Sequence, residues 1–180
     1  MAELVAPTMD LHASWLSARD EFVKAGELLH GGGPQPDDDV TSPAAFAAWI
    51  ERLAVMSDDS MPIAPGLVHA TYWWIVEDGE VAGSISLRHR LNEFLLEAGG
   101  QIGYSVRPTA RRRGLASWAL GEVLEHARTR RGLDRVMISC RDDNPGSART
   151  IERNGGVLED IRETPLGLTR RYWINLTPGN

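Results

Sequence analysis

Residues 101–131, QIGYSVRPTARRRGLASWALGEVLEHARTRR, predict a strand, a turn and a helix in succession. At the start of this stretch, apolar side chains alternate with small or polar ones, as in a strand with one buried face. Pro108 ends that pattern, and from about residue 112 to residue 131 apolar residues recur every three or four positions. The second spacing predicts an amphipathic helix that Gly132 terminates.

The sequence before this unit predicts two helices and then antiparallel strands. One helix starts at Leu11 and carries its apolar positions as far as Leu29, before the loop HGGGPQPDDD. A second helix starts at Ser42 as N-cap, with Pro43 in its first turn. Residues 71–89 predict two strands joined at Asp78-Gly79, and residues 91–100 predict a longer turn.

After the central helix, the strand-like segment RVMISC precedes a short helix that starts at Asn144-Pro145 and ends near Asn154. Residues 156–163 and 170–176 predict two more strands. The expected fold is a mixed α/β (α+β) domain, with a mostly antiparallel sheet and helices on both faces. At 180 residues, we expect residues 1–180 to form a single domain.

Composition narrows the class of protein. The chain carries a formal net charge of −6, with 42% hydrophobic and 24% charged residues, as in a globular protein. An acidic protein is a poor general binder of the phosphate backbone, so we expect no nucleic-acid partner. No segment approaches the roughly twenty apolar residues of a membrane span, and we expect no membrane partner.

Cys140 is the chain's single cysteine, so no internal disulfide is possible and we expect a cytoplasmic location. Its strand-like surroundings favour a buried structural thiol over a nucleophile, because no Cys-His motif accompanies it.

The turn RPTARRRGLA joins a strand to the start of a helix, where backbone N–H groups have no helical partner and the helix dipole is positive. Gly114 and Ala116 leave the backbone accessible to a bulky anion. The alternative is that Gly114 only permits a tight turn and the three arginines extend into water. Three cations at a helix N-terminus oppose its dipole, which favours an anion site such as one for a diphosphate.

This turn resembles the signature of the GNAT superfamily of N-acetyltransferases. Arg111-x-x-Gly114-x-Ala116 matches the R/Q-x-x-G-x-G/A motif with which that superfamily binds acetyl-CoA, and it lies between a strand and a long helix as the motif does there. The order of elements along most of the chain is also similar. The segments LRHRLNE, GGQIGY and TIERNGGVLE further resemble a bacterial branch of predicted acetyltransferases.

The resemblance implies a GNAT fold in which two strands splay apart around the pantetheine arm. Backbone groups of Tyr104, Ser105 and Val106 would hold that arm, with one N–H polarising the thioester carbonyl. The diphosphate would rest on backbone N–H groups of the turn: Arg111, Arg112, Arg113, Gly114, Leu115 and Ala116. Arginine side chains of the turn would also reach the adenosine 3′-phosphate, and the sequence does not distinguish which of the three does so. Asn144 and Ser147 match the family's N-x-x-S/A. Asn144 followed by Pro145 is also a good helix N-cap without any ligand.

The sequence departs from the family at the usual acid, a tyrosine seven residues after the asparagine, where this chain has Ile151. The proton would then return to the leaving thiolate from Tyr104, from water or from another group. Candidate bases for the amine are His89, Glu93, Glu97 and Tyr104. For His89 the alternative is a structural role, and for Glu93 it is a solvated turn carboxylate.

The resemblance thus implies an acetyl-CoA-dependent N-acyltransferase that acts on a small-molecule or peptidyl amine, without a metal. The missing tyrosine keeps open a non-catalytic acyl-CoA-binding sensor. A homodimer is possible, since dimers are common in the superfamily.

Overall fold

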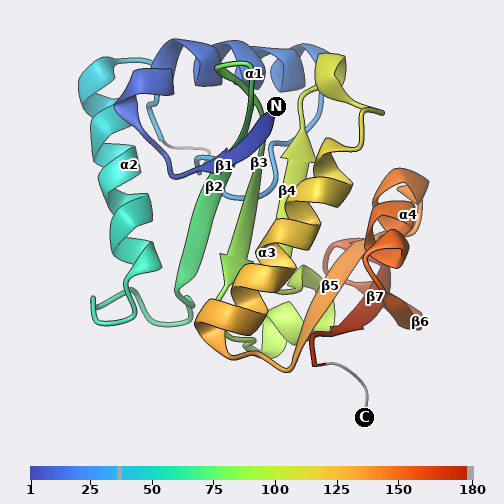
Figure 1. Cartoon of the computed structure of the whole chain (residues 1–180). Coiled ribbons are helices and arrows are strands. Elements are labelled where there is room, and N and C mark those ends of the chain that lie inside the picture. Colours follow the sequence, from blue (N-terminus) through green and yellow to red (C-terminus); the bar gives the residue numbers. More distant parts are fainter. Residues whose placement is uncertain (36–37, 178–180) are drawn as a thin grey trace.

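The computed structural model describes residues 1–35 and 38–177, whose strands form two adjoining sheets (Figure 1). The first sheet contains, in spatial order, β1 (Ala2–Val5), β2 (Ala70–Glu77), β3 (Glu80–Arg88) and β4 (Ile102–Val106). The second contains β5 (Arg135–Arg141), β7 (Gly167–Asn175) and β6 (Val157–Thr164). All neighbours within each sheet are antiparallel. The prediction of a mixed α/β fold with mostly antiparallel strands is confirmed.

Strand β1 was not predicted from the sequence. β1 has four residues, AELV, none of them fully buried, so it carries too short a pattern to be recognised. It pairs with residues 74–77 of β2. The predicted β2–β3 hairpin is confirmed: Asp78 and Gly79 have φ of 52° and 81°, as a type I′ turn requires.

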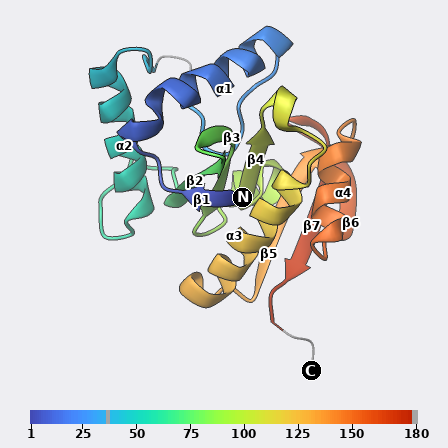
Figure 2. The same cartoon turned by 45° about the horizontal axis from the view of Figure 1, so that its top comes forward.

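Two helices, α1 (His12–Ala25) and α2 (Pro43–Ser57), cover one face of the first sheet (Figure 2). Their aromatic core packs Trp15, Phe46 and Trp49 against Trp74 of β2. The Ser42 cap is confirmed, since its hydroxyl accepts a hydrogen bond from Ala45 N–H at 3.2 Å. The first helix is shorter than predicted because Gly26, at φ 66°, takes the left-handed C-cap position.

Helix α3 (Leu115–Arg131) covers the opposite face, and α4 (Pro145–Arg153) packs against α3 and β5. The predicted apolar stripe of α3 is buried with core residues of β3, β4 and β5. The described residues also form three short helical turns: η1 (Met9–Leu11), η2 (Leu95–Gly99) and η3 (Pro108–Ala110). The π-helical turn η2 occupies the predicted long turn of residues 91–100. No helix of residues 1–35 and 38–177 is long and apolar enough to cross a membrane.

The two sheets meet at the start of β4. Gln101 N–H donates to Met137 C=O at 2.7 Å, and the buried Gln101 side chain accepts from Met137 N–H at 3.1 Å. Beyond this point no backbone hydrogen bond joins β4 to β5 in the described part of the chain. The strands therefore separate toward their carboxyl ends. We call the separated part of the two strands, Gly103–Val106 of β4 and Ser139–Arg141 of β5, the splay.

Candidate functional site

The splay exposes backbone groups of β4 on the side that faces β5. Arg107 N–H donates to Ala82 C=O and Arg88 N–H to Gln101 C=O, so every second residue of β4 directs its backbone groups to β3. Ser105 belongs to that set, and Tyr104 and Val106 face the other way. Ser105 was expected to hold a ligand through its backbone, but the strand register directs its backbone groups to β3, which leaves Tyr104 and Val106 as the residues that face β5.

The turn before α3 presents a row of unpaired donors. None of the backbone N–H groups of residues 112–117 donates to another group in the described chain. Gly114, the residue that caps the helix, has φ 82°, and a Cβ added there would meet no atom within 4 Å. The turn is open, and its donors combine with the positive end of a 17-residue helix. An anion is the ligand that such a turn favours.

Two of the three arginines turn their side chains away from these donors. Arg111 pairs with Glu27, its Nε donates to Val106 C=O at 3.0 Å, and its guanidinium lies 5.9 Å from the ring centre of Phe22. Arg113 pairs with Glu77 at 2.7 Å. The sequence left open which of the three arginine side chains reaches a phosphate, and these ion pairs leave Arg112 as the candidate. Arg112, at φ 61°, is exposed and makes no ion pair with a described residue.

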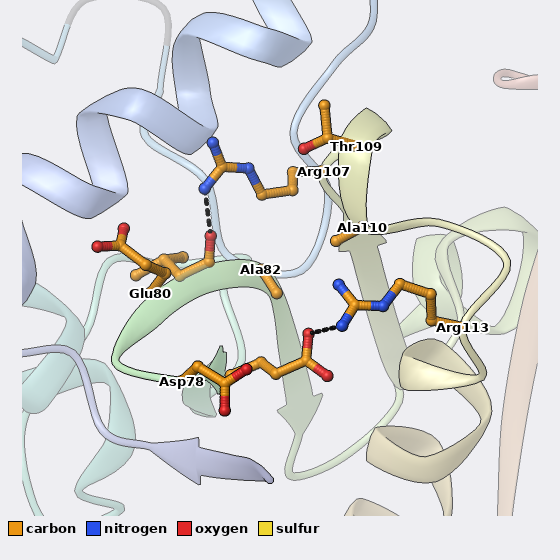
Figure 3. Close-up of a pocket in the computed structure, with 9 residues that line it drawn as sticks. Asp78, Glu80, Ala82, Arg107, Thr109, Ala110 and Arg113 are labelled. Atoms are coloured by element: carbon orange, nitrogen blue, oxygen red, sulfur yellow. Dashed lines mark hydrogen bonds and ion pairs between the residues drawn. The ribbon is translucent and has the colours of Figure 1, made fainter.

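Arg113 points into a polar hollow of about 200 Å³ between the β2–β3 hairpin and the turn (Figure 3). Arg107 enters the same hollow and donates to Val81 C=O at 3.1 Å. Arg107 also hydrogen-bonds Glu21 of α1, which lowers the pKa of that carboxyl to about 2. Both arginines are held in ion pairs, Arg107 with Glu21 of α1 and Arg113 with Glu77 of β2. Their role in the structure is therefore to join α1 and the hairpin to the end of β4.

At the other side of the splay, Asn144 caps α4 by accepting from Ser147 N–H at 3.0 Å. The predicted N-cap is confirmed. The Asn144 side-chain nitrogen donates to no described group, so it is available to a ligand. The Ser147 hydroxyl lies 2.8 Å from the hydroxyl of Tyr104, which crosses from β4 to reach it.

Tyr104 brings its hydroxyl to α4 one turn before the buried Ile151, the position of the family's usual acid. Burial raises the pKa of Tyr104 to about 12, an effect that hydrogen bonding to Ser147 opposes. The phenol stays protonated at neutral pH and is a permanent hydrogen-bond donor. Cys140 of β5 is buried nearby, and burial raises the pKa of its thiol, as expected of a structural cysteine.

The remaining candidate bases lie elsewhere. Glu93 is exposed and lines a hollow of about 370 Å³ with Glu97, Arg171 and other residues of η2, β6 and β7, none of them from β4, α3 or α4. His89 follows β3 at the opposite end of α3 from Gly114. Its ring contacts Asp59 at 2.6 Å, Thr71 at 2.8 Å and Arg131 at 2.7 Å. The structure thus places neither residue with Tyr104.

The His89 contacts predict a pH-dependent stability. Burial, opposed by Asp59, lowers the pKa of His89, and the nearby charges are Asp59, Arg131 and His69. Folding therefore favours the neutral ring, so its contribution is present above the ordinary pKa of about 6.5 and is lost as the pH falls through the folded value. We expect His89→Gln to lower the free energy of unfolding at pH 7.5 by about 1–2 kcal/mol. Denaturant unfolding between pH 5 and 8 should also show a shallower decline for the variant, and equal slopes would contradict this.

A residue that the sequence did not single out also lies at the splay. His30, in the loop after α1, accepts hydrogen bonds through its carbonyl from Ser84 and Ser105 at 2.7 and 2.8 Å. The only local signal was a histidine before three glycines, which predicts a loop but not where the loop packs.

These features define a class: an α/β domain with a candidate ligand site at the carboxyl ends of two separating strands joined by a crossover helix. The family model described as "Acetyltransferase (GNAT) domain" matches residues 7–157, so the chain belongs to the GNAT acetyltransferase family. The resemblance seen in the sequence is confirmed.

Curated and solved proteins agree with this membership. The chain is 33% identical to the ribosomal-protein-serine acetyltransferase of Escherichia coli (strain K12) over 91 residues, 51% of this chain and 49% of that protein, so the match spans about half the relative's length. Among solved structures, Mycobacterium smegmatis RimJ with CoA-disulfide has a TM-score of 0.71 at 18% identity, covering 97% of this chain and 81% of that one. RimL, a ribosomal L7/L12 alpha-N-protein acetyltransferase with coenzyme A, has 0.70 at 19%, covering 97% and 93%. At these identities the likeness shows the fold.

Proposed function

We propose that this protein is an acetyl-CoA-dependent N-acetyltransferase whose acceptor is a primary amine of a peptide or protein. The observation that carries the proposal is the row of unpaired N–H groups at residues 112–117, which opens beside the splay. A diphosphate needs several donors that do not have to leave other partners, and this turn offers them. The acceptor class rests on the Escherichia coli relative, whose name gives a ribosomal-protein serine as its target.

The residues present fit this cofactor. Backbone N–H groups of the turn, with the Arg112 side chain, would hold the diphosphate. Backbone groups of Tyr104 and the backbone N–H of Val106 would pair with the pantetheine, and the free Asn144 amide would add a donor. Acetyl-CoA supplies a thioester whose acetyl carbon an amine attacks. The N–H of Tyr104 or Val106 would stabilise the charge that develops on the carbonyl oxygen.

The Tyr104 hydroxyl would act on the sulfur side of the reaction. It is buried, protonated and within one helical turn of the usual acid position, so it can donate a hydrogen bond to the departing thiolate. This assigns to β4 a role that α4 has in many relatives.

The test of the proposal compares Gly114→Asp with Gly114→Asn. Both side chains tolerate a left-handed φ better than most, and they match in shape, so the pair differs by one negative charge beside the predicted diphosphate. We expect the Asp variant to bind acetyl-CoA about tenfold more weakly than the Asn variant, because like charges at short range near a surface repel by ~1–4 kcal/mol before solvent screening. Isothermal titration calorimetry measures the difference.

Binding of acetyl-CoA should also be visible as a gain in the stability of the wild-type protein. Acetyl-CoA at about 100 times its Kd should stabilise the wild-type protein by about 2.7 kcal/mol and raise its Tm. No rise would remove the cofactor assignment. Mass spectrometry of short peptides with N-terminal Ser or Ala then tests turnover, and binding without acetylation of any amine would favour the acyl-CoA sensor.

A further inference from the structure

The loop between α1 and α2 is pressed onto the strand that borders the splay. A Cβ added to Gly31 would lie 2.8 Å from the carbonyl oxygens of Gly103 and Ser84, so the backbone itself makes this contact. One residue earlier, the His30 carbonyl accepts from the hydroxyls of Ser84 and Ser105. His30 is therefore fixed over β4 by its main chain, whatever its side chain does.

The course of the loop places the His30 main chain over β3 and the edge strand β4. Glu27 contacts Arg111 beyond the end of β4, His30 lies over Ser105 of β4, and Gly32 lies over the ring of Tyr72 of β2. The chain thus comes down along β4 and only then turns inward across the sheet (Figure 1). Because β4 is the edge strand next to the splay, His30 stands where the loop passes the splay.

His30 and Tyr104 lie on opposite sides of β4. Neighbouring side chains of a strand point to opposite faces, so Tyr104 reaches α4 while Ser105 reaches the His30 loop. A thioester held along β4 would have the Tyr104 hydroxyl on one side and the His30 residue on the other. That is the separation required when one group faces the leaving sulfur and another faces the incoming amine.

The ring of His30 is also available. Three other histidines use ring nitrogens in hydrogen bonds: His12 with Val40, His69 with Met61, and His89 with Asp59. His126 packs edge-on against Trp73. The exposed side chain of His30 bonds no described residue through either nitrogen.

The surroundings of this ring favour its neutral form. Partial burial and the positive charge of Arg88 both lower the pKa of His30. Arg88 is itself fixed, donating to Gly99 and Gly100 carbonyls at 3.3 and 3.0 Å just before β4. The other groups facing the loop are the Tyr72 phenol, whose pKa is raised by burial, and the Glu27–Arg111 ion pair. A neutral imidazole is the form that accepts a proton.

We propose that His30 is the general base that accepts the proton of the acceptor amine. The inference rests on the proposed function. The lone pair of the neutral amine forms the N–C bond to the acetyl carbon, the electron pair of the C–S bond leaves on sulfur, and the surplus proton on nitrogen passes to the free imidazole nitrogen of His30. Solvent then takes that proton from the exposed ring.

The test uses His30→Gln, His30→Ala and, as a matched control at the far end of the sheet, His69→Gln. With the best N-terminal Ser or Ala peptide, we expect His30→Gln to lower kcat about 100-fold, the lower end of the effect of a general base. KM for acetyl-CoA should stay within twofold. The acidic limb of the kcat/KM profile should disappear in this variant and remain in His69→Gln. Added imidazole should restore part of the activity of His30→Ala, because the ring position is open to solvent.

A second readout needs no turnover. In NMR spectra, the imidazole proton signal that is absent from His30→Gln should titrate below pH 6.5, and addition of coenzyme A should shift it without shifting the His69 signal. An unchanged pH profile in His30→Gln, or a His30 signal insensitive to coenzyme A, would overturn the proposal while acetylation by the wild type leaves the proposed function intact. Failure of the wild type to acetylate any peptide would remove both.

Discussion

Tyr104→Phe should lower kcat by roughly 10- to 100-fold and leave the affinity for acetyl-CoA nearly unchanged. A hydrogen bond to a charged partner contributes about 1.5–3 kcal/mol, and every 1.4 kcal/mol corresponds to a factor of ten. The thiolate carries its charge only as the C–S bond breaks, so the loss falls on the transition state and not on binding. Steady-state kinetics with a peptide acceptor, together with calorimetric titration of acetyl-CoA, separates the two effects.

The matched control for that variant is Tyr172→Phe. Tyr172 is fully buried on β7, and its hydroxyl donates to Glu152 at 3.0 Å, so this change also removes one buried phenol hydrogen bond. Both variants should lose about 1 kcal/mol of stability. Only Tyr104→Phe should lose kcat, and equal kinetic losses in the two variants would mean that the effect comes from packing.

The fold was predictable to the extent that local patterns decide it. The 3.6-residue period of α3, the Ser42 cap of α2 and the Asp78-Gly79 turn are each specified by a few adjacent residues, and the structure has all of them. β1 was missed because four half-exposed residues become a strand only through their partners on β2. Gly26 likewise ended α1 although Leu29 continued the helical spacing.

The candidate site was likewise predictable only where adjacent residues specify it. The N–H row of the turn follows from a glycine at a strand-to-helix junction, which the sequence shows directly. The arginine side chains were predicted less well, because Glu27 and Glu77 lie 84 and 36 positions from their partners Arg111 and Arg113 and nothing local relates them. The positions of His30 and His89 also depend on contacts between distant parts of the chain. A loop carries His30 to β4, and Arg131 holds His89 at the distant end of α3.

Gly31→Ala should destabilise the protein by about 2–5 kcal/mol, more than a glycine substitution with a similar φ and no close neighbour. Its φ of 83° is unfavourable for alanine by about 1–2 kcal/mol, and a methyl group 2.8 Å from two backbone oxygens adds an overpacking penalty of about 1–3 kcal/mol. Neither oxygen belongs to a side chain that can move aside. The loop must therefore lift from β3 and β4, which also removes the His30 carbonyl from the hydroxyls of Ser84 and Ser105.

Gly26→Ala supplies the comparison, because Gly26 has a similar φ of 66° and a Cβ there would meet nothing within 4 Å. It should cost only the conformational part, about 1–2 kcal/mol, so the difference between the two variants in denaturant unfolding isolates the close approach of loop and sheet. If the two variants lose the same free energy, the loop does not press on β4 in solution. Gly31→Ala can instead have the lower free energy of unfolding and lose acetylation while it still binds acetyl-CoA. In that case the loop contact serves the acceptor side of the reaction, where His30 lies.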